Sequence, residues 1–554
     1  MEKDAWWKLN YVMAIGLRLI IVLTSTSFIH PDEHFQNSVI AIHDVFKPSS
    51  HQHRTWEWDP LRLPGHTIGG GPVRSIVPVW ITSHVALYTL KFFHVWGLIS
   101  LLESDRSHFC FTLDCPYNHS VATYRYLSWS WNNSLNQLAA SPSDISTRAL
   151  VIFPRLILFL LSLLVDGLIF RQVRSRTIQL LHAFSLHSLL LVFLLSLSIS
   201  NPKNPARLSC LIAWTLLNVF AVWVRVTYIC FAFPIVVMVG YTRLSRSFAL
   251  SFTVGATALL GMPLLIWLDS LYFGRWPTIA PISLLLYNLD PENLAQHGTH
   301  PRYLHLLVNG PIMFGPALWC VGWCQIWARL KHSPTIVNCV TSLRCISSVS
   351  MASLISGTLM LSIQPHQEAR FLLPLVFPLT ILCSRSTSKS PSSNFRRMFW
   401  VRTCVLNFFH LLHSGITVVL FGYLHQGGVQ LALENIPSEA KILLSYRTFD
   451  VPSALVTGAR MSKIENLRGV GEDVLVRALC ESSVRLDEER QLVLLAPRWA
   501  LTPELEDHFH LLFSSAMPHL DLDRLAHIFN AGPHRYGIGL YTIHPQTFRA
   551  SELC

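Results

Sequence analysis

The sequence predicts an all-α polytopic membrane protein: a transmembrane helix bundle with a large first lumenal loop and a small lumenal C-terminal α/β domain. Of its 554 residues, 51% are hydrophobic and only 14% are charged, whereas soluble domains carry roughly 25% charged residues. Apolar runs long enough to cross a bilayer recur along most of the chain. From residue 434 onward the sequence is instead rich in Asp, Glu and Arg, with alternating apolar runs.

The first apolar run, residues 11–29, leads directly into the polar sequence His30-Pro31-Asp32-Glu33. A cleaved signal peptide would end in a small-residue cleavage site, which this junction lacks. We therefore predict an uncleaved first span. About nine spans are expected in total, since a helix needs about 20 apolar residues to cross the membrane: 11–29, 150–170, 178–200, 208–240, 248–268, 306–328, 345–363, 371–383 and 400–423.

The apolar segment 75–102 is interrupted by polar residues and forms either a span or a helix in the membrane interface. Cytoplasmic loops are enriched in Lys and Arg, and the basic loops share one side only if this segment does not cross. These basic loops are 171–176, 243–246, 329–331 and 385–397. The N-terminus is then cytosolic, and the lumenal face carries loops 31–149, 269–305 and 364–370 and the domain 424–554.

The net charge of +11 is spread between the apolar runs, so it indicates topology rather than a nucleic-acid partner. Asn118 and Asn132 begin N-x-Ser sequons in the first lumenal loop and are expected to be glycosylated. Cys110 and Cys115 can close a small disulfide loop there. The cysteines in or beside apolar segments are expected to be small buried hydrophobes: Cys210, Cys230, Cys320, Cys324, Cys383 and Cys404.

Adjacent carboxylates, Asp32 and Glu33, stand where the first span ends. A carboxylate within hydrogen-bond reach of a hydroxyl can take its proton. The alternative is an acidic helix N-terminus with Pro31 in the first position. His30 and His34 are four residues apart, as in some metal sites, but the metalloprotease pattern places Glu directly after the first His, and we predict no metal site.

Aromatic and charged residues follow in the same loop: Trp56, Glu57, Trp58 and Arg74. Trp enrichment at membrane interfaces is one explanation. The other is that the paired Trp residues stack on a sugar ring while Arg74 binds a phosphate bidentately.

Two further lumenal loops carry ionisable groups at the membrane edge. The first ends with His297, His300 and Arg302, and the second holds His366, Gln367, Glu368 and Arg370. Ionisable residues in or beside a membrane are functional candidates, and Arg225, within the predicted span 208–240, is another.

Four ordered motifs resemble one family: His30-Pro31-Asp32-Glu33, Thr55-Trp56-Glu57-Trp58, Arg74-Ser75 and His366-Gln367-Glu368-Ala369-Arg370-Phe371. They are similar to the dolichyl-phosphate-mannose-dependent mannosyltransferases of glycosyltransferase family 22, which have a GT-C membrane fold. The resemblance implies a multi-pass enzyme of the endoplasmic reticulum with a lumenal active site, a lipid-linked sugar donor and no cofactor, with a divalent metal left open.

The resemblance also implies roles for residues. An inverting displacement needs one carboxylate as base, for which we predict Asp32, with Glu33 as second choice or as a hydroxyl-binding partner. The other matching or nearby polar residues are expected to bind substrate: His30, His34, Trp56, Glu57, Trp58, Arg74, His297, His300, Arg302, His366, Gln367, Glu368 and Arg370.

Within the family, residues 293–303, 307–309 and 424–429 resemble the members that add a fourth, α1,2-linked mannose to the GPI precursor, which implies a GPI glycolipid acceptor. The alternatives are an enzyme adding the third GPI mannose, an N-glycan α-mannosyltransferase, a transporter with buried charges and a non-catalytic scaffold. The chain departs from the family near its middle, where residues 196–207 replace an Arg-Thr-x-Ser-Asn-Ser-like stretch, which puts activity in question.

Overall fold

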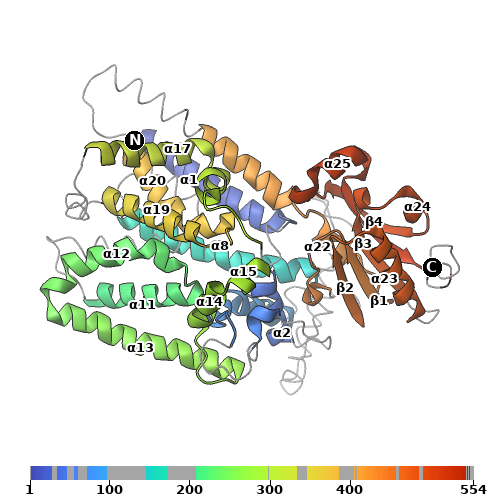
Figure 1. Cartoon of the computed structure of the whole chain (residues 1–554), viewed down its shortest axis with the longest axis horizontal. Coiled ribbons are helices and arrows are strands. Elements are labelled where there is room, and N and C mark those ends of the chain that lie inside the picture. The colour runs from blue at the N-terminus through green and yellow to red at the C-terminus, as the bar shows by residue number, and fades with distance from the viewer. Residues whose placement is uncertain are drawn as a thin grey trace, which may run out of the picture. The chain divides into compact units, whose positions relative to one another are not determined.

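The computed structural model describes residues 2–27, 34–46, 55–59, 71–95, 145–172, 208–296, 298–332, 346–385, 405, 408–456, 461–485, 491–544, 546, 548 and 554 (Figure 1). The chain forms two compact units. Unit 1 comprises Met1–Ile20, Thr55–Pro78 and Phe159–Val418, and unit 2 comprises Ile21–Arg54, Val79–Leu158 and Val419–Cys554.

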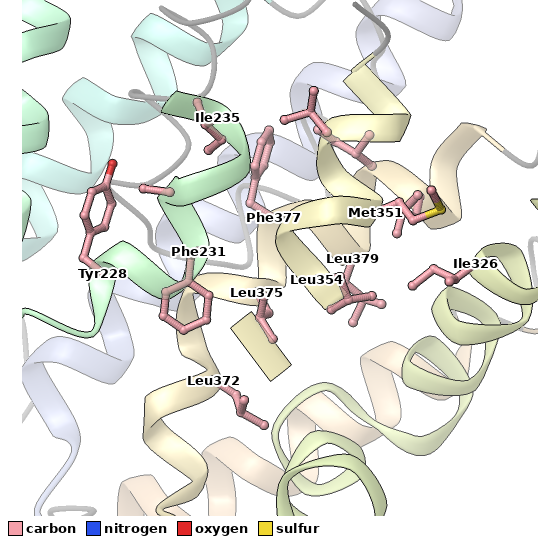
Figure 2. Close-up of a cluster of buried hydrophobic side chains, with 14 of the residues drawn as sticks. Tyr228, Phe231, Ile235, Ile326, Met351, Leu354, Leu372, Leu375, Phe377 and Leu379 are labelled. Atoms are coloured by element: carbon pink, nitrogen blue, oxygen red, sulfur yellow. The ribbon is translucent and has the colours of Figure 1, made fainter. Parts of the chain in front are cut away.

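Unit 1 is helical. Its helices are α11 (Leu208–Val224), α12 (Tyr228–Thr242), α13 (Phe248–Phe273), α14 (Ala280–Leu289), α15 (Pro291–Gln296), α16 (Gly310–Phe314), α17 (Pro316–His332), α19 (Ile346–Ile363) and α20 (Val376–Arg385), with parts of α1 (Glu2–Thr24) and α8 (Thr147–Gln172). Figure 2 shows part of its core, where Phe231 of α12, Leu354 of α19 and Leu379 of α20 meet. α12 and α19 pack closely because Gly357 has no side chain: a Cβ there would lie 2.4 Å from the Phe231 ring.

Three helices of the described residues are long and apolar enough to cross a membrane: Thr147–Leu164, Tyr228–Arg246 and Phe248–Phe273. Shorter apolar helices accompany them, including Leu208–Val224 and Ser348–Ile363. Phe248, Leu259 and Leu260 on α13 are at least 75% exposed. A row of exposed apolar side chains is costly in water and is accommodated by lipid, so the structure agrees with the predicted membrane protein.

Several predicted spans and one predicted loop differ from the observed helices. Residues 208–240 form two helices rather than one, because the backbone turns between Val224 and Tyr228 around Arg225. The run 306–328 is interrupted at Gly315, whose φ is +81°, and α17 restarts at Pro316, which lacks an N–H for a continuous helix. The predicted loop 269–305 contains α14 and α15. Residues 178–200 lie outside the described part.

α1 and α8 are joined by polar side chains between their apolar surfaces. Asp166 on α8 is buried, and it accepts hydrogen bonds from Arg18 at 2.5 Å and from the Tyr11 hydroxyl at 3.0 Å. A carboxylate inside a helix pair is tolerated when a cation and a hydroxyl satisfy it. The first predicted span is therefore a helix, although it ends at Thr24.

Unit 2 contains a five-stranded sheet in the order β2-β1-β3-β5-β4. The strands are β1 (Ala440–Tyr446), β2 (Lys463–Arg468), β3 (Gln491–Pro497), β4 (His510–Pro518) and β5 (Gly537–Ile543). β1 pairs in parallel with β2 and β3, whereas β5 runs antiparallel to β3 and β4. The leucines of β3 are buried, as expected for a central strand. The predicted combination of a helix bundle with a small C-terminal sheet is confirmed, and the boundary at residue 423 stays a prediction.

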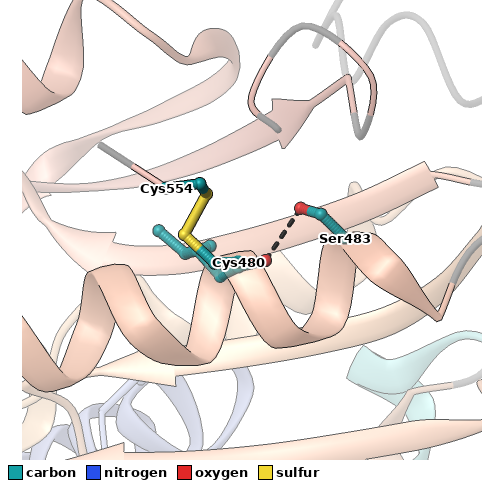
Figure 3. The surroundings of a disulfide bond; sticks show 4 residues. Cys480, Ser483 and Cys554 are labelled. Atoms are coloured by element: carbon teal, nitrogen blue, oxygen red, sulfur yellow. Dashed lines mark hydrogen bonds between the residues drawn. A yellow bond between two sulfur atoms is a disulfide. The ribbon is translucent and has the colours of Figure 1, made fainter. Parts of the chain in front are cut away.

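A disulfide that the sequence did not predict joins Cys480 of α23 (Glu472–Val484) to Cys554 (Figure 3). Of the cysteines expected to be buried, Cys383 is buried, whereas Cys320 and Cys324 on α17 are exposed. The expectation was wrong for these two, because an apolar helix in a membrane protein can expose apolar side chains to lipid. Cys110, Cys115, Asn118, Asn132 and Cys404 lie outside the described residues.

Candidate active site

The predicted base and three other candidate residues lie outside the described residues: Asp32, with His30, Glu33 and His297. The described part begins again directly after the first motif, at His34, which is buried at the start of η1 (His34–Ser38), and η1 continues into α2 (Val39–Phe46). The backbone of Trp56 begins a single 3₁₀ turn, η2 (Trp56–Trp58).

Glu57 and Arg74 form an ion pair. Arg74 Nη2 and Nε donate to Glu57 Oε1 at 3.0 and 3.2 Å, and both side chains are less than one-fifth exposed. Val73 N also donates to the Glu57 carbonyl at 3.0 Å. The second and third motifs of the sequence therefore meet, although they are separated by 17 residues.

Trp58 directly follows Glu57 in the second motif. Its side chain is buried and stacks on Phe273 at the end of α13, with ring centroids 6.2 Å apart. In this conformation the indole packs in the core of unit 1 rather than presenting a face to a ligand. The role of Trp58 in stacking on a sugar stays a prediction.

Asp269 is a buried polar residue that the sequence reasoning did not select. Its carboxylate accepts hydrogen bonds from Ser75 Oγ at 2.9 Å, from Ile76 N at 3.0 Å and from Trp223 Nε1 at 2.8 Å. The signal was present in the sequence as a single carboxylate directly after an apolar run, but only the fold shows that it faces the Arg74-Ser75 motif.

The two other loops that carry candidate residues, 298–305 and 364–370, are joined to each other. His300 N donates to the Pro365 carbonyl at 2.8 Å, and Gln367 N donates to His300 Nδ1 at 3.3 Å. The buried Gln367 amide accepts from His305 N and donates to the Ser362 and Gln364 carbonyls. Gln367 therefore positions the loops in this conformation and does not face a ligand.

His366, Glu368 and Arg370 form a charged cluster. His366 Nε2 lies 2.9 Å from Glu368 Oε1, and its Nδ1 lies 3.3 Å from the Gly298 carbonyl oxygen. Arg370 Nε donates to Glu368 Oε2. Because both ring nitrogens of His366 face acceptors and a neutral imidazole has only one N–H, this geometry favours the imidazolium.

The pKa shifts of His366 and Glu368 have opposite directions, and each favours the charged form of its group. The hydrogen bond to Glu368 raises the pKa of His366 and outweighs burial, which lowers it. Burial favours the neutral form of Glu368, but hydrogen bonds from His366 and Arg370 dominate and lower its pKa to about 2. Near neutral pH, Glu368 is therefore an anion that accepts from the Arg370 guanidinium and lies beside His366, whose protonated form it favours.

Further positive charge gathers around Phe371. The Arg225 guanidinium lies 5.1 Å from the centre of this ring and that of Arg370 lies 5.9 Å from it. The His366 ring packs edge-on at 6.0 Å. Arg225, isolated in an apolar run, thus joins the loop cluster because the chain turns between α11 and α12. The cluster carries more positive than negative charge and suits an anionic group.

An open, apolar groove of about 620 Å³ begins beside these loops. Arg302 stands two residues after His300 and Ile363 stands three residues before His366, so the groove starts where the joined loops meet the helices. It is lined by Arg302, Tyr303, Leu306, Trp323, Leu359 and Ile363, with Thr358 and Ser362. The surface of the groove is almost wholly apolar, which suits a hydrocarbon chain.

The chain resembles known mannosyltransferases over most of its length. The profile of the Alg9-like mannosyltransferase family matches residues 9–447. GPI mannosyltransferase 4 from Candida albicans is 28% identical over 476 residues, which cover 81% of this chain and 79% of the relative. Human GPI alpha-1,2-mannosyltransferase 4 is 28% identical over 486 residues, which cover 78% and 72%.

Among solved structures, ArnT from Cupriavidus metallidurans bound to undecaprenyl phosphate aligns with 99% of both chains, at 11% identity and a TM-score of 0.43. This likeness is too low to support an argument. The family profile, by contrast, covers far more than half of the sequence and includes all four motifs. The chain therefore belongs to the Alg9-like mannosyltransferase family and is a membrane glycosyltransferase.

Proposed function

We propose that the protein transfers mannose from dolichyl-phosphate-mannose to a GPI precursor, as the fourth, α1,2-linked mannose. The observation that carries this proposal is the likeness to GPI mannosyltransferase 4 from several fungi and to the human enzyme. The alignments with the Candida albicans and human relatives each cover at least 78% of this chain. The residues 293–303, 307–309 and 424–429, which resemble the same branch in the sequence, support it independently of the four family motifs.

The donor fits the chemistry of the described site. A dolichyl phosphate has a long hydrocarbon chain and an anionic head, and the apolar groove that Tyr303, Leu306 and Leu359 help to line suits the chain. The phosphate would be held by the cluster of His366, Arg370 and Arg225, because charge-assisted hydrogen bonds stabilise a phosphate leaving group. The Glu57–Arg74 pair would contact the sugar or the phosphate.

The mechanism is an inverting displacement in this proposal. The acceptor hydroxyl attacks the anomeric carbon from the face opposite the phosphate, the bond to the phosphate oxygen breaks, and Asp32 takes the hydroxyl proton. Glu33 would bind a hydroxyl. Within the described residues no group of three His, Cys, Asp and Glu side chains is arranged to hold a metal ion.

In this proposal, the protein lies in the membrane of the endoplasmic reticulum and its active site faces the lumen. The distribution of basic loops supports it. The Cys480–Cys554 disulfide also supports it, because disulfides persist in oxidising compartments. The GT-C arrangement of the helices and the domain boundary at residue 423 are part of the same proposal.

The test is the GPI intermediate that accumulates without the protein. Cells lacking it should accumulate a three-mannose precursor, and purified protein should add one mannose to that precursor from dolichyl-phosphate-mannose. Accumulation of a two-mannose precursor would assign the protein to the third transfer. Accumulation of a truncated lipid-linked N-glycan would assign it to N-glycan assembly.

A further inference from the structure

Asp269 is completely buried, and the groups that donate hydrogen bonds to its carboxylate are all neutral. It lies one turn before the end of α13 and its exposed fraction is 0%. A buried carboxylate is costly unless it is paired or well hydrogen-bonded, and here its three hydrogen bonds all come from neutral groups. The side chain cannot touch substrate in this conformation, so it is not a catalytic residue.

Each oxygen of Asp269 holds a different segment. Oδ1 accepts from Ser75 Oγ and Ile76 N, which follow Arg74 directly. Oδ2 accepts from Trp223 Nε1 at the end of α11. The carboxylate thus fixes the first loop to two membrane helices at once, and an apolar residue of similar size would leave three buried donors without acceptors.

Glu57, the ion-pair partner of Arg74, is held near the same end of α13 through the residue that follows it. Glu57 is followed by Trp58, which stacks on Phe273. Phe273 is four residues after Asp269, so the two side chains lie on one face of α13. Ser75 and Trp58 are therefore both held by the last turn of α13, and together they set where the Glu57–Arg74 ion pair lies.

We propose that Asp269 is a positioning residue for the Glu57–Arg74 pair. The inference rests on the proposed function, in which that pair contacts the mannosyl donor. The site depends on the hydrogen bonds that Asp269 accepts rather than on its negative charge. These bonds place the backbone of Arg74 so that the guanidinium meets Glu57. Misplacement of a binding group by about 1 Å can cost about 10²-fold in rate.

The test separates geometry from charge. In Asp269→Asn the amide oxygen can still accept from Ser75 and Ile76, but the amide N–H₂ then meets the indole N–H of Trp223, and two donors face each other. Trp223→Phe removes that indole donor. We therefore expect Asp269→Asn to lower kcat/KM for the donor by about 10- to 100-fold, and the double variant Asp269→Asn/Trp223→Phe to recover most of that loss.

The measurement is mannose transfer by full-length protein in nanodiscs at varied dolichyl-phosphate-mannose, with thermal unfolding of each variant. Asp290→Asn, an exposed carboxylate at the start of α15, is the matched control and should stay within about twofold of wild type, as surface changes usually do. Failure of the double variant to recover at unchanged unfolding temperature would mean that the charge is needed, and would overturn the proposal.

A second comparison uses Arg74. If Asp269 acts through Arg74, then Asp269→Asn should cost little in an Arg74→Met background, because the effects of coupled residues are not additive. Full additivity would overturn the proposal. Failure of the proposed function would be recognised differently, because the wild-type protein itself would then not transfer mannose. Binding of farnesyl-phosphate-mannose, a short-chain donor analogue, would then be compared among the same variants, and the same pattern of loss and recovery is expected.

Discussion

Arg155 on α8 donates a hydrogen bond of 3.1 Å to the carbonyl oxygen of Ser27. The same guanidinium donates to the carbonyl and hydroxyl oxygens of Ser25, both at 2.9 Å. Ser27 is buried, and its N–H donates to the Gly422 carbonyl at 3.2 Å. α1 has ended at Thr24, so these contacts hold a non-helical segment whose carbonyls have no helical partner.

Arg155→Met should lower the unfolding temperature and increase hydrogen exchange at Ser25 and Ser27. Hydrogen bonds to a charged group contribute about 1.5 to 3 kcal/mol each, and Met keeps the length of the side chain without the donors. Arg148→Met is a matched control, because Arg148 lies on the same helix, is exposed and contacts the segment around the end of α1 through a longer hydrogen bond, 3.4 Å to the Leu23 carbonyl. Equal exchange in the two variants would show that Arg155 does not order this segment.

Asp32→Asn should abolish mannose transfer while the protein stays folded and inserted, because Asn keeps the shape of Asp but cannot take a proton. General-base catalysis contributes about 10² to 10⁴ in rate. Glu33→Gln should cost less if Glu33 binds a hydroxyl. An acidic helix start predicts nearly full activity instead, since Asn caps a helix as well as Asp. Activity above about one-tenth of wild type would place the base elsewhere, because that loss is below the general-base range.

Transfer should fall as the pH rises through the raised pKa of His366, because the imidazolium that would face the donor phosphate loses its proton. Glu368→Gln removes the carboxylate that raises this pKa, so the fall should move to lower pH. The measurement is kcat/KM for the donor against pH. His508→Gln, a change at an exposed histidine of the C-terminal region, should leave the profile unchanged. If the pH profile of Glu368→Gln were unshifted, His366 would not be the group that causes the pH dependence.

The same cluster should stabilise the fold most at mildly acidic pH. The contribution of Glu368, whose pKa is lowered to about 2, is complete above the ordinary value of 4.5 and is lost as the pH falls. The contribution of His366, whose pKa is raised, is complete below the ordinary value of 6.5 and is lost as the pH rises. The difference in unfolding temperature between wild type and Glu368→Gln should therefore be greatest between pH 4.5 and 6.5.

Cys480 and Cys554 should resist alkylation in intact cells until a reductant is added, because the structure joins them in a disulfide and the proposal places them in the oxidising lumen. Non-reducing peptide mapping of purified protein should recover the two cysteines in one linked peptide. A tag after Cys554 should also be protected from protease in sealed microsomes. Digestion of the tag without detergent would contradict the lumenal position of the tail.

The sequence by itself determined the membrane class, the family and most candidate residues. Apolar runs identify helices because the cost of exposing backbone polar groups to lipid leaves few alternatives. The order of the motifs identifies the family because those residue types are set by chemistry. The same reasoning placed His366, Glu368 and Arg370 in one loop, which the structure shows as one charged cluster.

Only the tertiary structure decided which distant residues meet. Glu57 and Arg74 pair across a loop, and Arg225 reaches Phe371 because the chain turns where the sequence predicted a continuous helix. Asp269 gave one signal in the sequence, a single carboxylate after an apolar run, but its partners lie at positions 75, 76 and 223. The hydrophobic periodicity of a sequence indicates which face of a single helix is buried. The hydrogen bonds of a buried carboxylate depend on how three separate segments pack, and no local pattern specifies that packing.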